Sequence, residues 1–319
     1  MSFLTPLSFY VSLLLLLTLG EAEAQRGVET PVFRTGVQMV LVPVTVTDRN
    51  GTTILGLRAD DFKVFDDQRS QKIVSFSSDD APCSVGLILD ISGSMQPALS
   101  QAKEIAHAFF GAANAEDEFL LLTVSTQPAA TPEFTSDTAA LEESIGLTRP
   151  GGLTALIDTI HLGLSRMRDA QWPRRALLIV SDGKDNHSRY SQSELMRVAL
   201  EADVQIYTIV MDTGSEGVSS RSVPYRPSLI TKPWDRAKER QGPEMLEKLS
   251  DQTGGLHLSV FNSADAKEAV IKVGRALRNE YVIGYHPLDS RTSGRFHRIR
   301  VKLDVAKADV RARKGYYSY

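Results

Sequence analysis

The middle of the chain alternates between continuous apolar runs of strand length and segments whose apolar residues recur at helical spacing. A strand that is apolar on both faces is typical of a parallel sheet covered by helices on both sides. The runs that predict such strands are 85–91, 119–124, 176–181 and 204–210. We therefore expect an α/β fold with a doubly wound, mostly parallel, Rossmann-like sheet.

Helical stripes occupy the segments between and after these strands. They predict helices around 99–109, 157–167 and 195–199, followed by helices at 244–251 and 264–279 on either side of a strand at 257–261. The segment 212–242 is rich in Ser, Pro, Arg and Gly and has no such spacing. A loop of this length is usually functional or disordered, so we expect either a recognition loop or a segment without fixed structure.

The two ends of the chain carry β patterns with one polar face. Strands are predicted at 37–48, 61–67 and 71–76 before the α/β region, with 67–70 as the hairpin turn between the last two. Further strands are predicted at 281–285, 296–303 and 310–313 after it. Neither end supplies enough strands for an independent sheet, so we expect the two ends to pair into a small antiparallel sheet or sandwich. The predicted organisation is a signal peptide at 1–24, a leading β segment at 25–82, the α/β domain at 83–279 and a trailing β segment at 280–319.

The first residues contain an apolar stretch at 9–20 that is short for a membrane span. It ends in Ala22-Glu23-Ala24, a small-x-small pattern that predicts a secretory signal cut after Ala24 and hence a secreted or periplasmic protein. No Lys or Arg precedes the apolar stretch. An uncleaved membrane anchor therefore remains the alternative, and it is the only route by which we expect membrane association.

Composition adds three constraints. With 319 residues, of which 42% are hydrophobic, the chain can bury a substantial core. The net charge of −3 gives no case for nucleic-acid binding. Cys83 is the one cysteine, which excludes an internal disulfide.

Polar side chains of one chemical kind occur at three places on the predicted α/β domain. Asp90, Ser92 and Ser94 lie at the carboxyl end of its first strand, Thr154 follows a glycine pair that opens a helix, and Asp182 follows the third strand. Hydroxyl and carboxylate oxygens suit Mg²⁺, Mn²⁺ or Ca²⁺, whereas zinc favours His or Cys. The sequence therefore predicts a site for a divalent cation, with simple turn chemistry as the alternative. For Thr154 the alternative is a cap on the helix that begins at Ala155.

In this order the segments resemble the metal-ion-dependent adhesion site of the von Willebrand factor A domain, whose pattern is Asp-x-Ser-x-Ser, a distant Thr and a distant Asp. The leading and trailing β segments look like those of secreted proteins related to this domain that recur in acidobacteria. The resemblance implies that the hydroxyls of Ser92, Ser94 and Thr154 bind a cation, Mg²⁺ by preference, directly. It further implies that the carboxylates of Asp90 and Asp182 bind the cation either directly or through water. It also implies a partner protein whose exposed Asp or Glu completes the coordination.

Catalytic patterns are weak by comparison. Asp212-Thr213-Gly214-Ser215 matches the active-site string of pepsin-like proteases, which need two such aspartates, and the chain has one copy. The Gly-x-Ser-x-Gly elbow of hydrolases and the P-loop are both absent from the sequence. We therefore predict a non-enzymatic protein that binds a protein partner through the cation. The alternative is a structural or assembly subunit in which the metal loop only stabilises the fold.

Overall fold

The computed structural model describes residues 39–49, 51–78, 80–213, 233–288, 294–305 and 308–318, of which 233–240 are described as backbone alone. The predicted signal peptide at 1–24 and residues 214–232 of the predicted loop lie outside these ranges. Within the described ranges, no helix combines the length and the apolar character that crossing a membrane requires.

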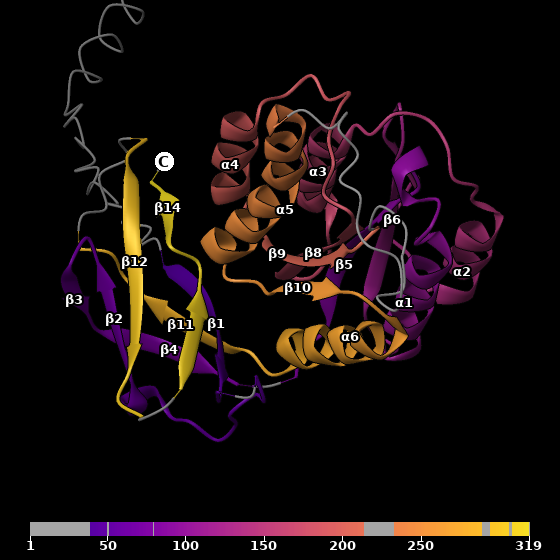
Figure 1. Ribbon diagram of the computed structural model, residues 1–319. Coiled ribbons are helices and arrows are strands. Elements are labelled where there is room, and N and C mark those ends of the chain that lie inside the picture. The colour runs from indigo at the N-terminus through magenta and orange to yellow at the C-terminus, as the bar shows by residue number, and fades with distance from the viewer. Residues whose placement is uncertain are drawn as a thin grey trace, which may run out of the picture. The chain divides into compact units, whose positions relative to one another are not determined.

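A six-stranded sheet in the order β10-β9-β8-β5-β6-β7 forms the centre of the α/β domain (Figure 1). Its first five strands are parallel, and the short β7 is antiparallel to β6. Every residue of the central strand β5 is buried, as expected for a strand covered on both faces. The strands are β5 (Cys83–Asp90), β6 (Glu118–Val124), β7 (Ala129–Ala130), β8 (Arg174–Ser181), β9 (Gln205–Met211) and β10 (His257–Val260).

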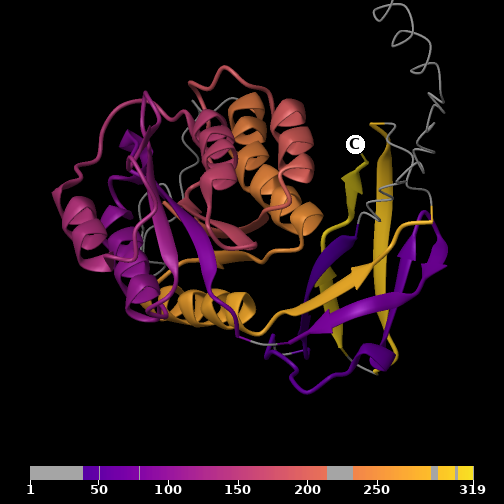
Figure 2. The same ribbon diagram turned by 180° about the vertical axis from the view of Figure 1, so that it is seen from behind.

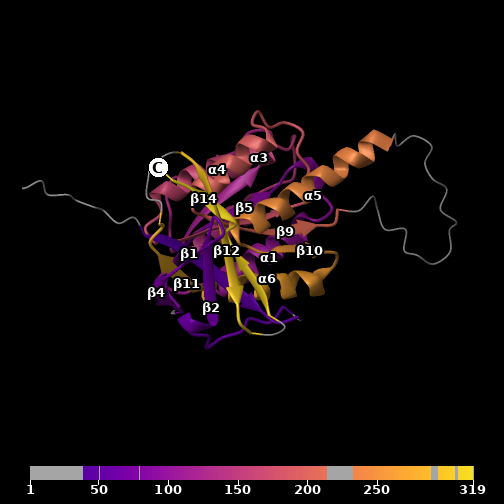
Figure 3. The same ribbon diagram turned by 90° about the vertical axis from the view of Figure 1, so that its left-hand side faces the viewer.

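Helices cover both faces of this sheet and bury their apolar stripes in two separate cores. One core includes α1 (Leu99–Gly111), α2 (Thr138–Leu147) and α6 (Ser263–Arg278). The other includes α3 (Leu156–Arg166), α4 (Gln192–Glu201) and α5 (Pro233–Thr253). Figure 3 shows α5 and α6 on opposite sides of β9 and β10. Short 3-10 turns occur at Ala59–Asp61, Gly93–Met95 and Met167–Asp169.

Strands from the two ends of the chain form two four-stranded antiparallel sheets, in the orders β13-β1-β11-β4 and β14-β12-β2-β3. Val42 pairs with Ile283, and Val64 pairs with Val301, so each sheet joins a leading to a trailing strand (Figure 2). Side chains from both sheets share one core. The strands are β1 (Val40–Thr47), β2 (Phe62–Asp66), β3 (Arg69–Gln71), β4 (Ile73–Ser77), β11 (Tyr281–Tyr285), β12 (Phe296–Leu303), β13 (Asp309–Ala312) and β14 (Gly315–Tyr317).

The predicted fold class, a doubly wound sheet with a small β structure made from both ends, is therefore confirmed. The prediction for 212–242 is wrong in its last part, because α5 begins at Pro233 rather than near residue 244. Proline is well suited to the first position of a helix, where its missing N–H is not needed. Pro233 was predicted to lie in a loop because the surrounding segment is rich in Ser, Pro, Arg and Gly.

Glu280 links the two parts of the fold, since it lies directly between α6 and β11 and is buried. The hydroxyl of Tyr207 donates a hydrogen bond to its Oε1 at 3.1 Å. Burial raises the pKa of Glu280 from 4.5 to about 7, although Arg174 and the bond from Tyr207 act in the opposite direction. The native state therefore holds this proton over a pH range in which the unfolded chain has already lost it.

Because the pKa of Glu280 is higher in the native state than in the unfolded chain, we expect the free energy of unfolding to fall as the pH rises from 4.5 to about 7. At about 1.4 kcal/mol per pKa unit, the contribution is roughly 3 kcal/mol. Chemical denaturation of the wild type and of Glu280→Gln between pH 4 and 8 measures it. The variant should lose much less stability over this range, and parallel profiles would show that the proton on Glu280 is not responsible.

Candidate metal site

The strand order creates a crevice at the carboxyl end of the sheet. β5 lies between β6 and β8, so the chain leaves β5 toward one edge of the sheet and later returns to its other side. Loops that follow two such strands diverge, and ligands of doubly wound proteins bind in the opening between them. β5 ends at Asp90 and β8 ends at Ser181, which places Asp90 and Asp182 on the two sides of this opening.

Asp90 is fully buried and connects the two loops directly. Its Oδ1 accepts a hydrogen bond from the backbone N–H of Ser92 at 2.9 Å, and its Oδ2 accepts one from the Ser181 hydroxyl at 2.5 Å. The oxygen of Ser181 in turn accepts from the backbone N–H of Gly183 at 2.9 Å. Ser181 thus holds the carboxylate of Asp90 and the turn after Asp182 in one network, a role that we did not predict for it.

Ser92 and Ser94 present two hydroxyl oxygens that lie 3.2 Å apart. Ser92 is buried and Ser94 is half-buried at the 3-10 turn that follows β5. Around Mg²⁺, with bonds of about 2.1 Å and octahedral geometry, neighbouring ligand oxygens lie about 3.0 Å apart. The separation of the two hydroxyls therefore fits adjacent positions on a single hard cation.

The loop that carries Thr154 lies against the loop of Ser92 and Ser94. The N–H of Gly93 donates to the carbonyl of Gly152 at 3.1 Å, and the N–H of Gly151 donates to that of Ile91 at 2.9 Å. Gly152 has a φ of +80°, a conformation that glycine adopts without strain. These bonds hold the start of the Thr154 loop beside the serine pair.

Thr154 itself is buried, and it does not cap α3. The capping residue of α3 is Ala155, with no side-chain hydrogen bond to the helix. Instead, two side chains from the loop after β8 accept hydrogen bonds from the first N–H groups of α3. The carboxylate of Asp185 accepts from the N–H of Ile157 at 2.9 Å, and the hydroxyl of Ser188 accepts from the N–H of Asp158 at 3.1 Å. The helix-cap interpretation of Thr154 is therefore wrong, and its side chain is not needed by the helix.

The same loop also holds the backbone of Thr154. Asn186 accepts a hydrogen bond from the N–H of Thr154 through its Oδ1 at 2.9 Å and donates its own N–H to the Thr154 carbonyl at 3.0 Å. The segment after Asp182 thus contacts the Thr154 loop, just as Ser181 contacts Asp90. All three predicted segments are connected around the crevice.

Asp182 is buried, and each of its oxygens has a partner. Its Oδ1 accepts the backbone N–H of Lys184 at 3.1 Å. Its Oδ2 lies 3.1 Å from the Lys184 ammonium and accepts the Thr213 hydroxyl at 3.2 Å. Thr213 follows β9, the strand beside β8, so a residue that the sequence placed in a protease-like string instead supports Asp182.

The electrostatics of the crevice favour an added cation. The pKa of Asp90 is raised to about 6, mainly because burial disfavours its charged form. The negative charge of Asp182 raises it as well, whereas the hydrogen bond from Ser181 lowers it. A divalent ion bound beside Asp90 would stabilise the charged form of this carboxylate. Asp90, Ser92, Ser94, Thr154 and Asp182 therefore fit a hard cation in donor chemistry, but their joint coordination of one ion stays a prediction.

Lys184 provides a test of these electrostatics, because its ammonium lies against a predicted cation ligand. The Lys184→Met variant should bind Mg²⁺ about three- to tenfold more tightly, since a positive charge that opposes the cation is removed. The effect is limited because the side chain of Lys184 is 40% exposed and therefore screened by water. Calorimetric titration of this variant beside Lys248→Met, an exposed lysine on α5, measures the difference. Unchanged or weaker binding would place the cation elsewhere.

A doubly wound sheet with this loop set at its switch point defines the class of domain. Residues 85–184 match the family model described as the von Willebrand factor type A domain, so the chain carries a domain of this family. The predicted resemblance to the family is thus confirmed. The narrower likeness to secreted acidobacterial proteins stays a prediction.

Several solved structures are similar to parts of the chain. A von Willebrand factor type A protein from Catenulispora acidiphila is 13% identical, with 87% of this chain and 73% of that chain covered and a TM-score of 0.49. The conserved hypothetical protein BatB from Bacteroides thetaiotaomicron is 17% identical, with 61% and 98% covered and a TM-score of 0.45. The pilus adhesin SpaC from Lactobacillus rhamnosus GG is 11% identical, with 63% and 31% covered and a TM-score of 0.46. A search of curated proteins gave no match.

Proposed function

We propose that this protein binds a protein partner through a divalent cation, with Mg²⁺ preferred over Mn²⁺ or Ca²⁺. Asp90, Ser92, Ser94, Thr154 and Asp182 hold the cation, and the partner supplies an Asp or Glu side chain. The observation that carries the proposal is the pair of serine hydroxyls, 3.2 Å apart beside the buried Asp90 at the switch point of the sheet. The family of the domain supports an interaction role.

The charge balance of the site explains why an acidic partner is preferred. Three of the five predicted ligands are neutral hydroxyls, so they leave much of the ion's positive charge uncompensated. Lys184 reduces the negative charge that Asp182 contributes, because its ammonium lies 3.1 Å from the Asp182 carboxylate. A carboxylate from outside can then complete the octahedron at about 2.0–2.1 Å from Mg²⁺.

This function requires no catalytic group, and we propose a binding role rather than an enzymatic one. We also propose that the protein acts outside the cytoplasm, in secreted or periplasmic form. That part of the proposal rests on the apolar segment and the Ala22-Glu23-Ala24 pattern of the sequence alone. Microsequencing of the exported protein tests it, and a mature chain that begins at Gln25 is the expected result.

The binding proposal is tested with arrays of immobilised peptides that contain a single Asp or Glu, each matched by a peptide with Asn or Gln in its place. Binding of the full chain should require both Mg²⁺ and the acidic residue, and EDTA should release the protein. If the metal loop only stabilises the fold, EDTA will lower the melting temperature without changing which peptides bind. Binding that survives EDTA would therefore contradict our proposal and favour the structural alternative.

A further inference from the structure

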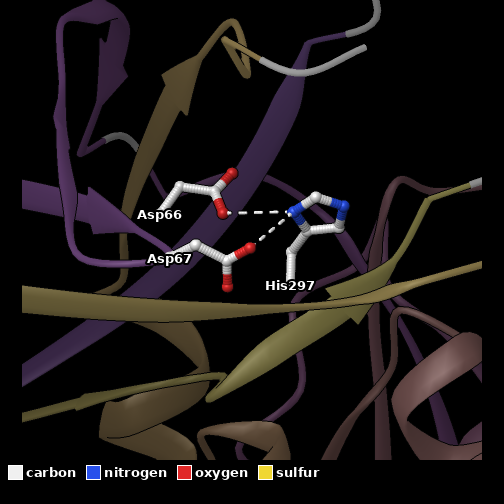
Figure 4. A group of neighbouring side chains, drawn as sticks. All are labelled: Asp66, Asp67 and His297. Atoms are coloured by element: carbon white, nitrogen blue, oxygen red, sulfur yellow. Dashed lines mark ion pairs between the residues drawn. The ribbon is translucent and has the colours of Figure 1, made fainter. Parts of the chain in front are cut away.

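A second group of metal-ligand atoms lies in the part of the fold formed by the two chain ends. Asp66 ends β2, Asp67 follows in the turn to β3, and His297 lies on β12 (Figure 4). One oxygen of each aspartate and one ring nitrogen of His297 all lie within 4.8 Å of one another. None of these residues contributes to the candidate metal site described above.

Backbone structure brings the three side chains together. Asp67 and Gln68 have φ values of +45° and +72°, which is the conformation of a tight two-residue hairpin turn. β12 pairs with β2, and the N–H of Asp67 donates to the Arg298 carbonyl at 2.9 Å. Oδ1 of Asp67 accepts the N–H of Arg298 at 3.0 Å, while its Oδ2 lies toward the ring of His297.

The ring nitrogen of His297 forms ion pairs with both carboxylates, but at distances longer than a direct hydrogen bond. Nδ1 of His297 lies 3.5 Å from Oδ1 of Asp66 and 3.3 Å from Oδ2 of Asp67. A protonated imidazole bonded to a carboxylate has a separation of about 2.7–2.9 Å. By contrast, two ligands that are each about 2.0–2.1 Å from a tetrahedral zinc ion lie about 3.3–3.4 Å apart. The separations of His297 Nδ1 from the two carboxylate oxygens thus resemble those between ligands of one tetrahedral ion.

Burial gives a second, independent indication of a ligand. Asp66 is 5% exposed, and its Oδ1, which lies toward His297, has no hydrogen-bond partner. His297 is 4% exposed. A buried carboxylate oxygen without a partner is energetically costly, and a metal ion at the centre of the group would satisfy it.

The surroundings hold the two buried ligands in place. Oδ2 of Asp66 accepts hydrogen bonds from the hydroxyls of Tyr285 at 3.0 Å and Tyr316 at 2.9 Å. The ring of His297 stacks on that of Tyr316, with 5.2 Å between centroids. Hydrogen bonds like those that Asp66 accepts orient the ligating carboxylates of many metal sites, whereas Nε2 of His297 has no partner among the described residues.

The open side of the group faces a cavity of 170 Å³ that is lined by all three residues and by Arg69, Gln71, Leu288 and Arg295. This space leaves a fourth coordination position for water or for a group from outside. Arg295 competes for one ligand, since its guanidinium lies 3.2 Å from Oδ2 of Asp67. Its side chain is 64% exposed and is therefore free to move into solvent.

We propose that Asp66, Asp67 and His297 bind one divalent transition-metal ion, with zinc as the ion that fits best. One imidazole and two carboxylates suit zinc and cobalt, whereas the all-oxygen candidate site suits Mg²⁺. The inference is independent of the proposed function, because it uses other residues and another class of ion.

The test uses the full chain with Ser92→Ala and Ser94→Ala, which removes the predicted Mg²⁺ site. Titration with Co²⁺, followed by visible absorption, should show one equivalent bound with the intense bands of a tetrahedral ion, and Zn²⁺ should displace it. His297→Phe keeps a ring for Tyr316, and Asp67→Asn keeps a side chain suited to a positive φ. Each substitution should weaken Zn²⁺ binding at least about tenfold.

Two control variants distinguish this site from adventitious binding. His286→Phe removes an exposed histidine outside the group and should leave Zn²⁺ affinity unchanged. Arg295→Ala removes the competing guanidinium and should make binding tighter. Circular dichroism checks that each variant is folded. Absence of tetrahedral Co²⁺ bands, or equal Zn²⁺ affinity in the His297→Phe and His286→Phe proteins, would overturn the proposal.

Discussion

The Ser92→Ala and Ser94→Ala substitutions together are expected to lower the affinity for Mg²⁺ by at least about 100-fold, because both remove oxygens that we place on the ion. The fold should survive, since the Ser92 N–H that binds Asp90 is a backbone group and is retained. Titration calorimetry measures the loss, and thermal unfolding without metal checks the fold. The matched control is Ser144→Ala, which removes an exposed hydroxyl on α2 that bonds only within its helix.

Two results would count against this part of the account. Equal heats of Mg²⁺ binding in the double variant and in the Ser144→Ala protein would show that the serine hydroxyls are not ligands. A wild type that releases no heat with Mg²⁺, Mn²⁺ or Ca²⁺ would show that the Asp90–Ser94 loop is a structural turn without a cation site.

The second large effect is expected from Gly183→Ala. Gly183 has a φ of +78°, and an added Cβ would lie 2.9 Å from the backbone nitrogen of Pro243 in α5. Strain and this contact together should lower the free energy of unfolding by about 2–4 kcal/mol. Because Asp182 precedes Gly183, relief of the contact should also move this ligand and weaken Mg²⁺ binding at least about tenfold.

A second glycine with a similar φ separates the effect of backbone strain from that of the contact with α5. Gly56 has a φ of +79°, and nothing lies within 4 Å of an added Cβ there. Gly56→Ala should therefore lose only about 1–2 kcal/mol of stability and bind Mg²⁺ normally. Denaturant unfolding and calorimetry measure both quantities. If Gly183→Ala behaves like Gly56→Ala, the close packing of α5 against the metal loop does not control the site.

The parts of the fold that the sequence predicted are those in which local pattern and tertiary environment agree. β5 and β8 read as continuous apolar runs because both of their faces are buried, and the ends of the chain alternate because one face of each sheet is exposed. The pattern missed α2, which buries only Leu141 and Ile145. It also missed β7, which has two residues. Such short or weakly amphipathic elements depend on contacts that the sequence does not show.

The candidate metal site also contains some residues that the sequence predicted and others that it did not. Asp90, Ser92 and Ser94 share one loop, so their chemistry is visible in a short motif. Ser181 and Thr213 act on carboxylates that belong to neighbouring strands, and only the strand order brings them there. The sequence made this proximity partly predictable, because Ser181 ends one apolar strand of a parallel sheet, Thr213 follows another, and such strands end at the same edge.

The sequence alone could not predict the group formed by Asp66, Asp67 and His297. Asp66 and His297 are more than two hundred residues apart, and they meet because β2 pairs with β12 in one specific register. We predicted that the ends would pair, but alternation alone does not give the register. A shift of one residue would have turned His297 to the opposite face.

A crystal structure of the full chain grown with Mn²⁺, with anomalous diffraction data, would locate the bound cation itself. We expect an anomalous peak within about 2.5 Å of the hydroxyl oxygens of Ser92 and Ser94, on the side where Thr154 and Asp182 lie. A map with no peak there, or with Thr154 and Asp182 too far from the peak to reach it directly or through one water, would contradict it.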